Sequence, residues 1–105
     1  MRIVETSVFT RQVVAALADE EYRALQATLA ERPGLGVRIP GGGGLRKIRW
    51  GLPGRGKRGG VRVIYYWAVG LDTIVMLFLY PKNVQGDLSA SQLRALRRII
   101  EEEYP

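Results

Sequence analysis

The feature that most constrains the fold is a pair of alternating segments, residues 45–50 and residues 61–68, separated by a glycine-rich stretch. In an extended chain successive side chains point to opposite faces, so Leu45, Lys47 and Arg49 share one face of the first segment. Two such segments joined by a glycine-rich connection predict a β-hairpin with a long loop. We take this hairpin as the element around which the rest of the chain is organised.

The charge of this region is one-sided. Residues 32–71 contain no Asp or Glu, although the whole chain has 16 basic and 10 acidic residues and a net charge of +6. A folded domain usually intersperses both signs on its surface, so a polyanionic partner is the direct explanation, and RNA is the polyanion we expect. The basic residues of this region are Arg32, Arg38, Arg46, Lys47, Arg49, Arg55, Lys57, Arg58 and Arg62.

Length and composition predict a single folded domain over residues 1–105. The hydrophobic fraction of 47% is ordinary for a globular protein and argues against disorder. The chain has no cysteine and no histidine. Disulfides, thiolate metal sites and the usual general base are therefore excluded, and we expect neither a metal nor a cofactor. Acid–base chemistry in this chain would have to use Lys, Arg, Tyr or carboxylate groups.

One stretch has the composition of a membrane span. Residues 63–81 carry a single charge, Asp72, which lies near their centre. Inserting a carboxylate there costs about 2.5–3.5 kcal/mol, and the β-branched and aromatic residues on both sides favour strands. We therefore predict two buried strands joined by a turn at residues 69–72, and no membrane partner. The N-terminus lacks the apolar segment of a signal peptide, which predicts a cytoplasmic protein.

The remaining segments predict helices and one further strand. Residues 2–5 are assigned to a short strand and residues 10–18 to a short helix. Asp19 is the predicted N-cap of a longer helix that ends at Pro33-Gly34. Residues 88–104 form the clearest helical pattern.

The start of that last helix has a recognisable cap. Ser89 and Gln92 have the spacing of a capping box, with Leu88 and Leu93 as its hydrophobic staple. Before it, residues 73–80 are almost wholly apolar and predict a central strand. The prediction is an α+β fold with an N-terminal strand and two helices, a three-stranded antiparallel sheet and a C-terminal helix.

Two glycine-rich stretches have more than one interpretation. Residues 41–44 are either a flexible loop or a backbone-amide cradle for phosphate, and we favour the loop because no helix follows. Residues 51–57 match the G-x-x-x-x-G-K spacing of a nucleotide-binding loop. Because Arg58 replaces the Ser or Thr that binds magnesium, and a strand follows in place of a helix, we reject that interpretation. A basic tip that follows a nucleic-acid backbone and a solvated loop with incidental charge remain.

Three segments together resemble a known family. They are L-R-K-I-R-W at residues 45–50, G-K-R-G-G-V-R-V-I-Y-Y at residues 56–66, and Y-P-K-N at residues 80–83 followed by Asp87-Leu88. They are similar to the RelE/ParE superfamily of bacterial toxins, and within it to the HigB toxins of type II toxin–antitoxin modules, including their phage-related relatives. The resemblance covers nearly the whole chain and implies a RelE-like α+β domain.

The resemblance also implies an activity. Members of this kind enter the ribosomal A site and cut mRNA there without a metal ion. Carried over by motif, the basic pair of the first hairpin strand is Lys47 and Arg49, the arginine of the second strand is Arg62, and the basic position after the last strand is Lys82. Members also use a late tyrosine; the spacing of Tyr104 does not fit, and Tyr80 and Tyr66 remain as substitutes. The catalytic candidates are Lys47, Arg49, Arg62, Lys82 and Tyr80.

The chemistry of RNA cleavage suggests a role for each group. RNA supplies its own nucleophile, the 2′-hydroxyl, so the protein has to move protons and stabilise charge on the phosphorus. We expect Arg62, aided by Arg49, to hold the phosphate, because a guanidinium binds two oxygens at once. Lys47 is the candidate base, since neighbouring cations disfavour its charged form. Lys82 is the candidate acid or second phosphate clamp.

Further RNA contacts are expected from the basic residues of the hairpin, which are Arg46, Arg55, Lys57 and Arg58. Bases could stack on Trp50 or Tyr66, or both rings could be packed in the core or across strands, which we favour. The partners implied by the resemblance are a HigA-like antitoxin with a helix-turn-helix, the ribosome with its rRNA, and mRNA. Two other functions stay open: a ParE-like inhibitor of DNA gyrase that cuts nothing, and a non-catalytic RNA-binding module.

Overall fold

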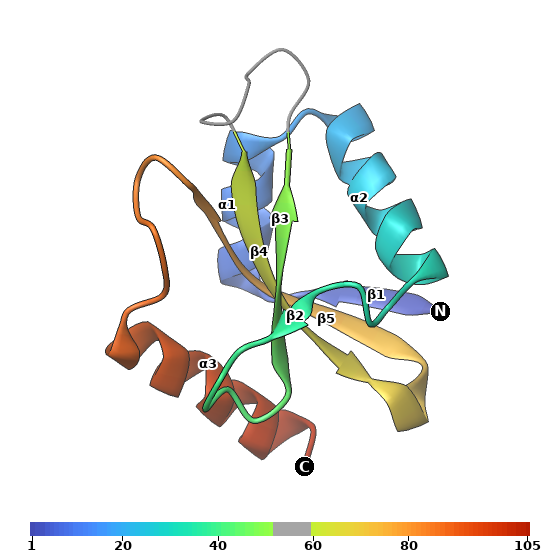
Figure 1. Ribbon diagram of the computed structural model, residues 1–105. Coiled ribbons are helices and arrows are strands. Elements are labelled where there is room, and N and C mark those ends of the chain that lie inside the picture. Colours follow the sequence, from blue (N-terminus) through green and yellow to red (C-terminus); the bar gives the residue numbers. More distant parts are fainter. Residues whose placement is uncertain (52–59) are drawn as a thin grey trace.

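A computed structural model describes residues 1–51 and 60–105 and shows a mixed sheet with helices on both faces (Figure 1). The predicted α+β class is confirmed. Along the chain the elements are β1 (Arg2–Glu5), α1 (Ser7–Ala16), α2 (Asp19–Glu31), β2 (Val37–Arg38), β3 (Leu45–Trp50), β4 (Val61–Ala68), the short 3-10 helix η2 (Val69–Leu71), β5 (Thr73–Pro81) and α3 (Ala90–Glu103).

The sheet has five strands in the order β1-β5-β4-β3-β2. Its centre is the predicted antiparallel unit of β3, β4 and β5. The prediction of only three strands in the sheet is wrong at both edges, because β1 joins β5 in parallel and β2 joins β3 antiparallel. The β2 strand lies within the segment predicted to be a connector, and its two residues lack an alternating apolar pattern that could reveal it.

Each face of the sheet carries its own hydrophobic core. One core packs α1 and α2, through Phe9, Val13, Leu25 and Leu29, against Ile48, Val63 and Tyr65 of the sheet. The other packs Leu96 and Ile100 of α3 against Leu45, Ile64 and Val75. The predicted alternation of β3 and β4 is therefore confirmed, since Leu45 and Ile64 face α3 whereas Ile48 and Val63 face α1 and α2.

A bulge in β5 decides which way the end of that strand faces. Ile64 pairs with Phe78 and the next residue of β4, Tyr65, pairs with Met76, so Leu77 is an extra residue in β5. Strict alternation would put Tyr80 on the same face as Met76, toward α1 and α2. Because of the extra residue, Phe78 and Tyr80 instead belong to the core under α3.

The helices α1 and α2 begin earlier than predicted, because a residue closer to the N-terminus takes the cap position of each. The Thr6 hydroxyl accepts from Phe9 N at 3.1 Å, so α1 begins at Ser7 and not at residue 10. The predicted N-cap at Asp19 is wrong: the cap position is Ala18, whose amide donates to the Glu21 carboxylate at 2.8 Å. The predicted capping box of α3 is confirmed, because Ser89 Oγ accepts from Gln92 N at 3.1 Å.

The segment of four glycines is a compact turn between β2 and β3. Ile39 N donates to Leu45 O at 2.9 Å, and three of the four glycines have positive φ. At Gly44 a Cβ would lie 2.9 Å from the Tyr66 ring, so this position requires glycine for space as well as for φ. Arg97 of α3 donates to Gly41 O at 3.0 Å. The loop interpretation therefore describes this segment, which packs against β4 and α3.

Two predictions about connections remain. Residues 63–81 form β4 and β5 joined by η2, as predicted, and no helix in the described ranges is long and apolar enough to cross a membrane. The rejected nucleotide-binding spacing over residues 51–57 and the basic hairpin tip fall almost wholly on residues 52–59, outside the described residues.

Candidate functional site

Three of the predicted site residues stand side by side across the central strands. Arg49 of β3 is the cross-strand partner of Arg62 in β4, and Arg62 is the partner of Tyr80 in β5. Directly opposed residues on neighbouring strands have Cβ atoms about 5 Å apart. We call these three residues the Arg–Tyr row. It lies on the α3 side of the sheet, where Tyr80 is part of the core under α3.

Arg62 is the centre of this row and is only 7% exposed. Among the described residues it is the one charged side chain that is buried, and it forms no ion pair with any of them. Burying an uncompensated charge is costly. A buried guanidinium that lacks a carboxylate partner is therefore suited to bind an anion from outside the chain.

The Tyr80 hydroxyl is buried and has no hydrogen-bond partner in the described part of the chain. Burial raises the pKa of this hydroxyl above its usual value, and the Asp87 carboxylate raises the pKa further, while Arg62 and Arg49 act in the opposite direction. The phenol is thus protonated at neutral pH. It is a hydrogen-bond donor beside two guanidinium groups.

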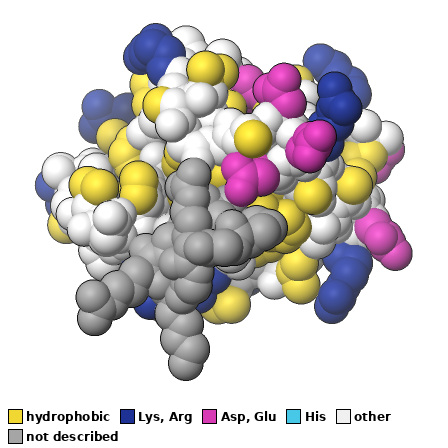
Figure 2. Space-filling view, turned by 90° about the horizontal axis from the view of Figure 1, so that it is seen from above, with side chains coloured by type: hydrophobic (Ala, Val, Ile, Leu, Met, Phe, Trp, Pro, Cys, Tyr) yellow, Lys and Arg dark blue, Asp and Glu magenta, His cyan; other side chains and the backbone are white. Residues whose placement is uncertain are grey.

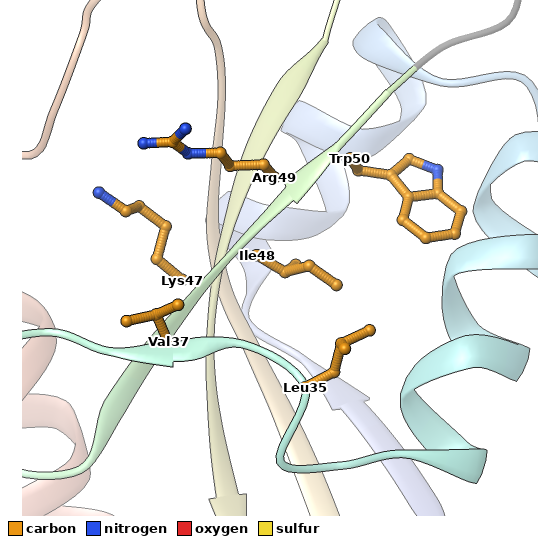
Figure 3. A pocket seen from close by; sticks show the side chains of 6 residues that line it. All are labelled: Leu35, Val37, Lys47, Ile48, Arg49 and Trp50. Carbon is orange, nitrogen blue, oxygen red and sulfur yellow. The ribbon is translucent and has the colours of Figure 1, made fainter.

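Lys47 lies next to the row on the same face. Figure 3 shows Lys47 and Arg49 pointing to one side of β3, and Ile48 and Trp50 pointing to the other. Lys47 Nζ donates to Asp87 Oδ1 at 3.3 Å. Two guanidinium groups, one ammonium group and one phenol therefore share a single face, and groups of these kinds can form charge-assisted hydrogen bonds to an anion.

Asp87 is a neighbour of the site that was not among the predicted site residues, although it lies in a segment that resembles the family. It belongs to the connection between β5 and α3, and its Oδ1 also accepts from Leu88 N at 2.9 Å. That backbone bond, followed by the Lys47 ammonium, holds the pKa of the Asp87 carboxyl below its usual value. Its position two residues before the capping residue Ser89 could have indicated it, because the start of a helix holds the neighbouring residues in place.

A group of acidic residues lies on α2, away from the Arg–Tyr row. The first turn of α2 contains Asp19, Glu20 and Glu21. Figure 2, which looks down on that end of the molecule, shows acidic side chains gathered on this part of the surface. Since α2 covers the opposite face of the sheet, these carboxylates do not neutralise the Arg–Tyr row.

Residues 1–103 match the profile of a family described as the RelE toxin of the RelE / RelB toxin-antitoxin system. The chain belongs to the RelE toxin family. It is therefore a toxin of a toxin–antitoxin system, and an antitoxin is its implied partner. The resemblance to the RelE/ParE superfamily is confirmed.

In this RelE-family toxin the fourth predicted cation, Lys82, follows the last residue of β5. Its backbone N donates to Gly60 O at 3.1 Å, beside the pairing of Val61 with Pro81. Arg62 and Tyr80 are the next pair along the same ladder. Lys82 therefore lies at the end of the sheet that holds the row, and its side chain is exposed.

The residues predicted to bind RNA separate into different places. Arg46 faces away from the row, and its Nη1 donates to Gly36 O at 2.9 Å and to Gly34 O at 3.2 Å. Trp50 packs against the core under α1 and α2. Tyr66 faces α3, but it is four positions from Arg62, or about 13 Å along the strand. Arg55, Lys57 and Arg58 lie outside the described residues.

The late tyrosine also lies apart from the row. The Tyr104 ring packs against Tyr66 with ring centroids 6.3 Å apart. Of the two substitutes for it, Tyr80 is the one beside Arg62.

Proposed function

We propose that this RelE-family toxin is a ribosome-dependent endoribonuclease of the HigB-like branch, which cuts mRNA in the A site without a metal ion. The observation that supports this proposal most directly is the Arg–Tyr row with Lys47 beside it. These groups supply both the positive charge and the proton donor that cleavage of RNA by its own 2′-hydroxyl requires. The site of action places the toxin in the cytoplasm with ribosomes, rRNA and mRNA, and a HigA-like antitoxin is its proposed partner.

The two arginines have the first task, which is to hold the scissile phosphate. Arg49 is exposed and meets the phosphate first, whereas Arg62 lies deeper in the sheet. Each guanidinium donates to non-bridging oxygens. Because Arg62 is shielded from water, its interaction with the extra negative charge of the phosphorane is stronger than at an exposed site. Lys82 supplies a second clamp on the neighbouring backbone.

Proton transfer completes the reaction. Lys47 must first release its ammonium proton to solvent, because only the neutral amine can act as a base. The 2′-oxygen then forms a bond to phosphorus as Lys47 Nζ takes the 2′-hydroxyl proton, and the bond from phosphorus to the 5′-oxygen breaks as the Tyr80 hydroxyl gives that oxygen a proton. The products are a 2′,3′-cyclic phosphate and a 5′-hydroxyl. Tyr80 suits the role of donor because its hydroxyl is protonated and is not engaged by a described residue.

Lys47 requires a test of its own, because its ammonium is paired with Asp87 in this structure. Lys47→Arg keeps the positive charge but cannot accept the proton. If Lys47 is the base, this variant loses about as much cleavage as Lys47→Ala. If Lys47→Arg retains cleavage, Lys47 is a phosphate ligand and the base is another group.

The proposal is tested with purified ribosomes, an mRNA and the toxin, with cuts mapped by primer extension and the end groups of the products analysed. We expect cuts only in translated frames, with cyclic phosphate and 5′-hydroxyl ends, and a loss of at least about 100-fold with Arg62→Ala. Arg23→Ala, an exposed arginine on α2, is the matched control. A 5′-phosphate product, or full cleavage by Arg62→Ala, would contradict the scheme.

A toxin that arrests growth but cuts no mRNA would point instead to gyrase. A supercoiling assay with purified gyrase then shows whether the toxin inhibits that enzyme. The clustered cations of the row favour the nuclease over this alternative, because inhibition of gyrase does not require a phosphodiester-binding site.

A further inference from the structure

A basic hollow lies at the end of the sheet away from the Arg–Tyr row. Its volume is about 480 Å³, and its lining includes Arg38, Gly43, Gly44, Arg46, Tyr66 and Trp67. Trp67 is five positions beyond Arg62 in β4, which is about 16 Å along the strand. Arg46 and Trp67 also belong to the face under α1 and α2, whereas the Arg–Tyr row faces α3. The hollow is thus separate from the proposed site of cleavage.

Two arginines are opposed in this hollow. Arg38 and Arg46 are cross-strand partners in β2 and β3, and like charges placed directly opposite destabilise a sheet. Arg46 donates to two carbonyl oxygens, which leaves its charge unneutralised. Arg38 is exposed and forms no ion pair with any described residue, and no Asp or Glu is among the lining residues. A bound anion would relieve this repulsion.

Aromatic rings form the wall beside these arginines. Trp67 is partly exposed and lies against Gly34, where a Cβ would be 3.7 Å from the indole ring. Tyr66 lies against Gly44, which has a φ of +105° and leaves no room for a side chain. The absence of a side chain at Gly44 therefore lets the Tyr66 ring lie close to the backbone at the edge of the hollow. Guanidinium groups beside accessible aromatic rings are typical of surfaces that bind single-stranded RNA, where a base stacks and its phosphate is paired.

We propose that this hollow binds one nucleotide of single-stranded RNA, with the phosphate on Arg38 and Arg46 and the base against Trp67. The inference rests on the proposed function in taking RNA as the polyanion. It adds a second contact that holds RNA without taking part in cleavage. An acidic peptide would satisfy the arginines but would make no use of the indole ring.

The test measures binding of a fluorescent single-stranded RNA of about ten nucleotides to full-length Arg62→Ala protein, which cannot cleave if the proposed function is right. We expect Arg38→Ala to weaken binding several-fold and to reduce the slope of log affinity against log salt by about 0.7, the loss of one phosphate contact. Trp67→Leu keeps an apolar side chain but cannot stack, and we expect about a fivefold to tenfold loss. Arg23→Ala is the control. Unchanged affinity in both hollow variants would overturn the proposal.

Photocrosslinking gives an independent answer if Trp67→Leu does not fold. RNA carrying 4-thiouridine should crosslink to the peptide that contains Tyr66 and Trp67; crosslinks confined to Lys47, Arg49 and Arg62 would overturn the proposal. So would a glutamate peptide that displaces the RNA equally well from wild-type and Trp67→Leu protein.

Failure of the proposed function is a different result. In that case the wild-type toxin cuts no mRNA on ribosomes, while binding still depends on Arg38 and Trp67. Conversely, if cleavage of mRNA depends on Arg62 but binding of RNA does not depend on Arg38 and Trp67, the proposed function stands and the proposal for the hollow is rejected.

Discussion

Arg62 lies directly opposite Tyr80 in the ladder between β4 and β5, and both side chains are buried. Neither is satisfied by a described residue: Arg62 has no ion pair and the Tyr80 hydroxyl has no hydrogen-bond partner. A buried cation beside a buried, unpaired phenol reduces stability. We therefore propose that Arg62 and Tyr80 contact a common ligand and are not present for stability.

Tyr80→Phe removes only the hydroxyl and tests this explanation. Because that hydroxyl is buried without a partner, the free energy of unfolding should stay the same or rise by up to about 1 kcal/mol. Cleavage of ribosome-bound mRNA should fall by about 100-fold, the usual contribution of a positioned proton donor. Urea denaturation and single-turnover cleavage measure the two effects. Loss of stability together with retained cleavage would show that Tyr80 is a packing residue.

Tyr65→Phe should have the opposite outcome. Its hydroxyl accepts from Gly36 N at 2.7 Å and donates to Pro33 O at 2.8 Å, which ties the end of α2 to the sheet. Removing it leaves two backbone groups unsatisfied, so we expect a loss of about 1–3 kcal/mol in the free energy of unfolding. Cleavage per folded molecule should not change. A stability equal to that of the wild type would show that water replaces both bonds.

The Gln12 side chain accepts a backbone hydrogen bond from β5 beyond the last residue that pairs with β1. Its Oε1 accepts from Leu79 N at 2.8 Å, in the residue directly before Tyr80. Gln12→Ala should cost about 1–3 kcal/mol by leaving that amide unpaired, and should lower cleavage by loosening the strand that carries Tyr80. Gln12→Glu retains an acceptor and serves as the matched comparison. Equal stability of the Ala and Glu variants would mean that the bond contributes little.

Asp87→Asn should change how stability depends on pH. The pKa of the Asp87 carboxyl is depressed in the folded protein, so its contribution is present above the unfolded pKa of about 3.9 and is lost as the pH falls through the lower folded value. The variant should therefore be less stable than the wild type at pH 7, and this difference should shrink on acidification below about pH 4. Urea denaturation at several pH values measures it. Glu102→Gln, an exposed carboxylate on α3, is the control, and a difference independent of pH would contradict the assignment.

Local patterns in the sequence were sufficient for most elements. The alternation of residues 45–50 and 61–68 defined β3, β4 and their two faces, and the Ser89 and Gln92 spacing defined the start of α3. These signals depend on contacts within a few residues, so they can be read without the fold. The two-residue strand β2 was missed because pairing with Lys47 and Arg46 created it. The cap at Ala18 was missed because alanine has no side-chain acceptor that would mark a cap, although its amide donates to the nearby Glu21 carboxylate.

The sequence by itself determined the class of the fold, the family and the cations that share a face of the hairpin, because all of these follow from residue types at fixed spacings. Only the tertiary structure decided which residues meet. The extra residue at Leu77 turned Tyr80 toward Arg62, and the connection before α3 brought Asp87 to Lys47. The pairing of β2 with β3 placed Arg46 opposite Arg38, in a separate hollow beside Trp67. A bulge and a long connection act between segments far apart in the chain, and no local periodicity contains them.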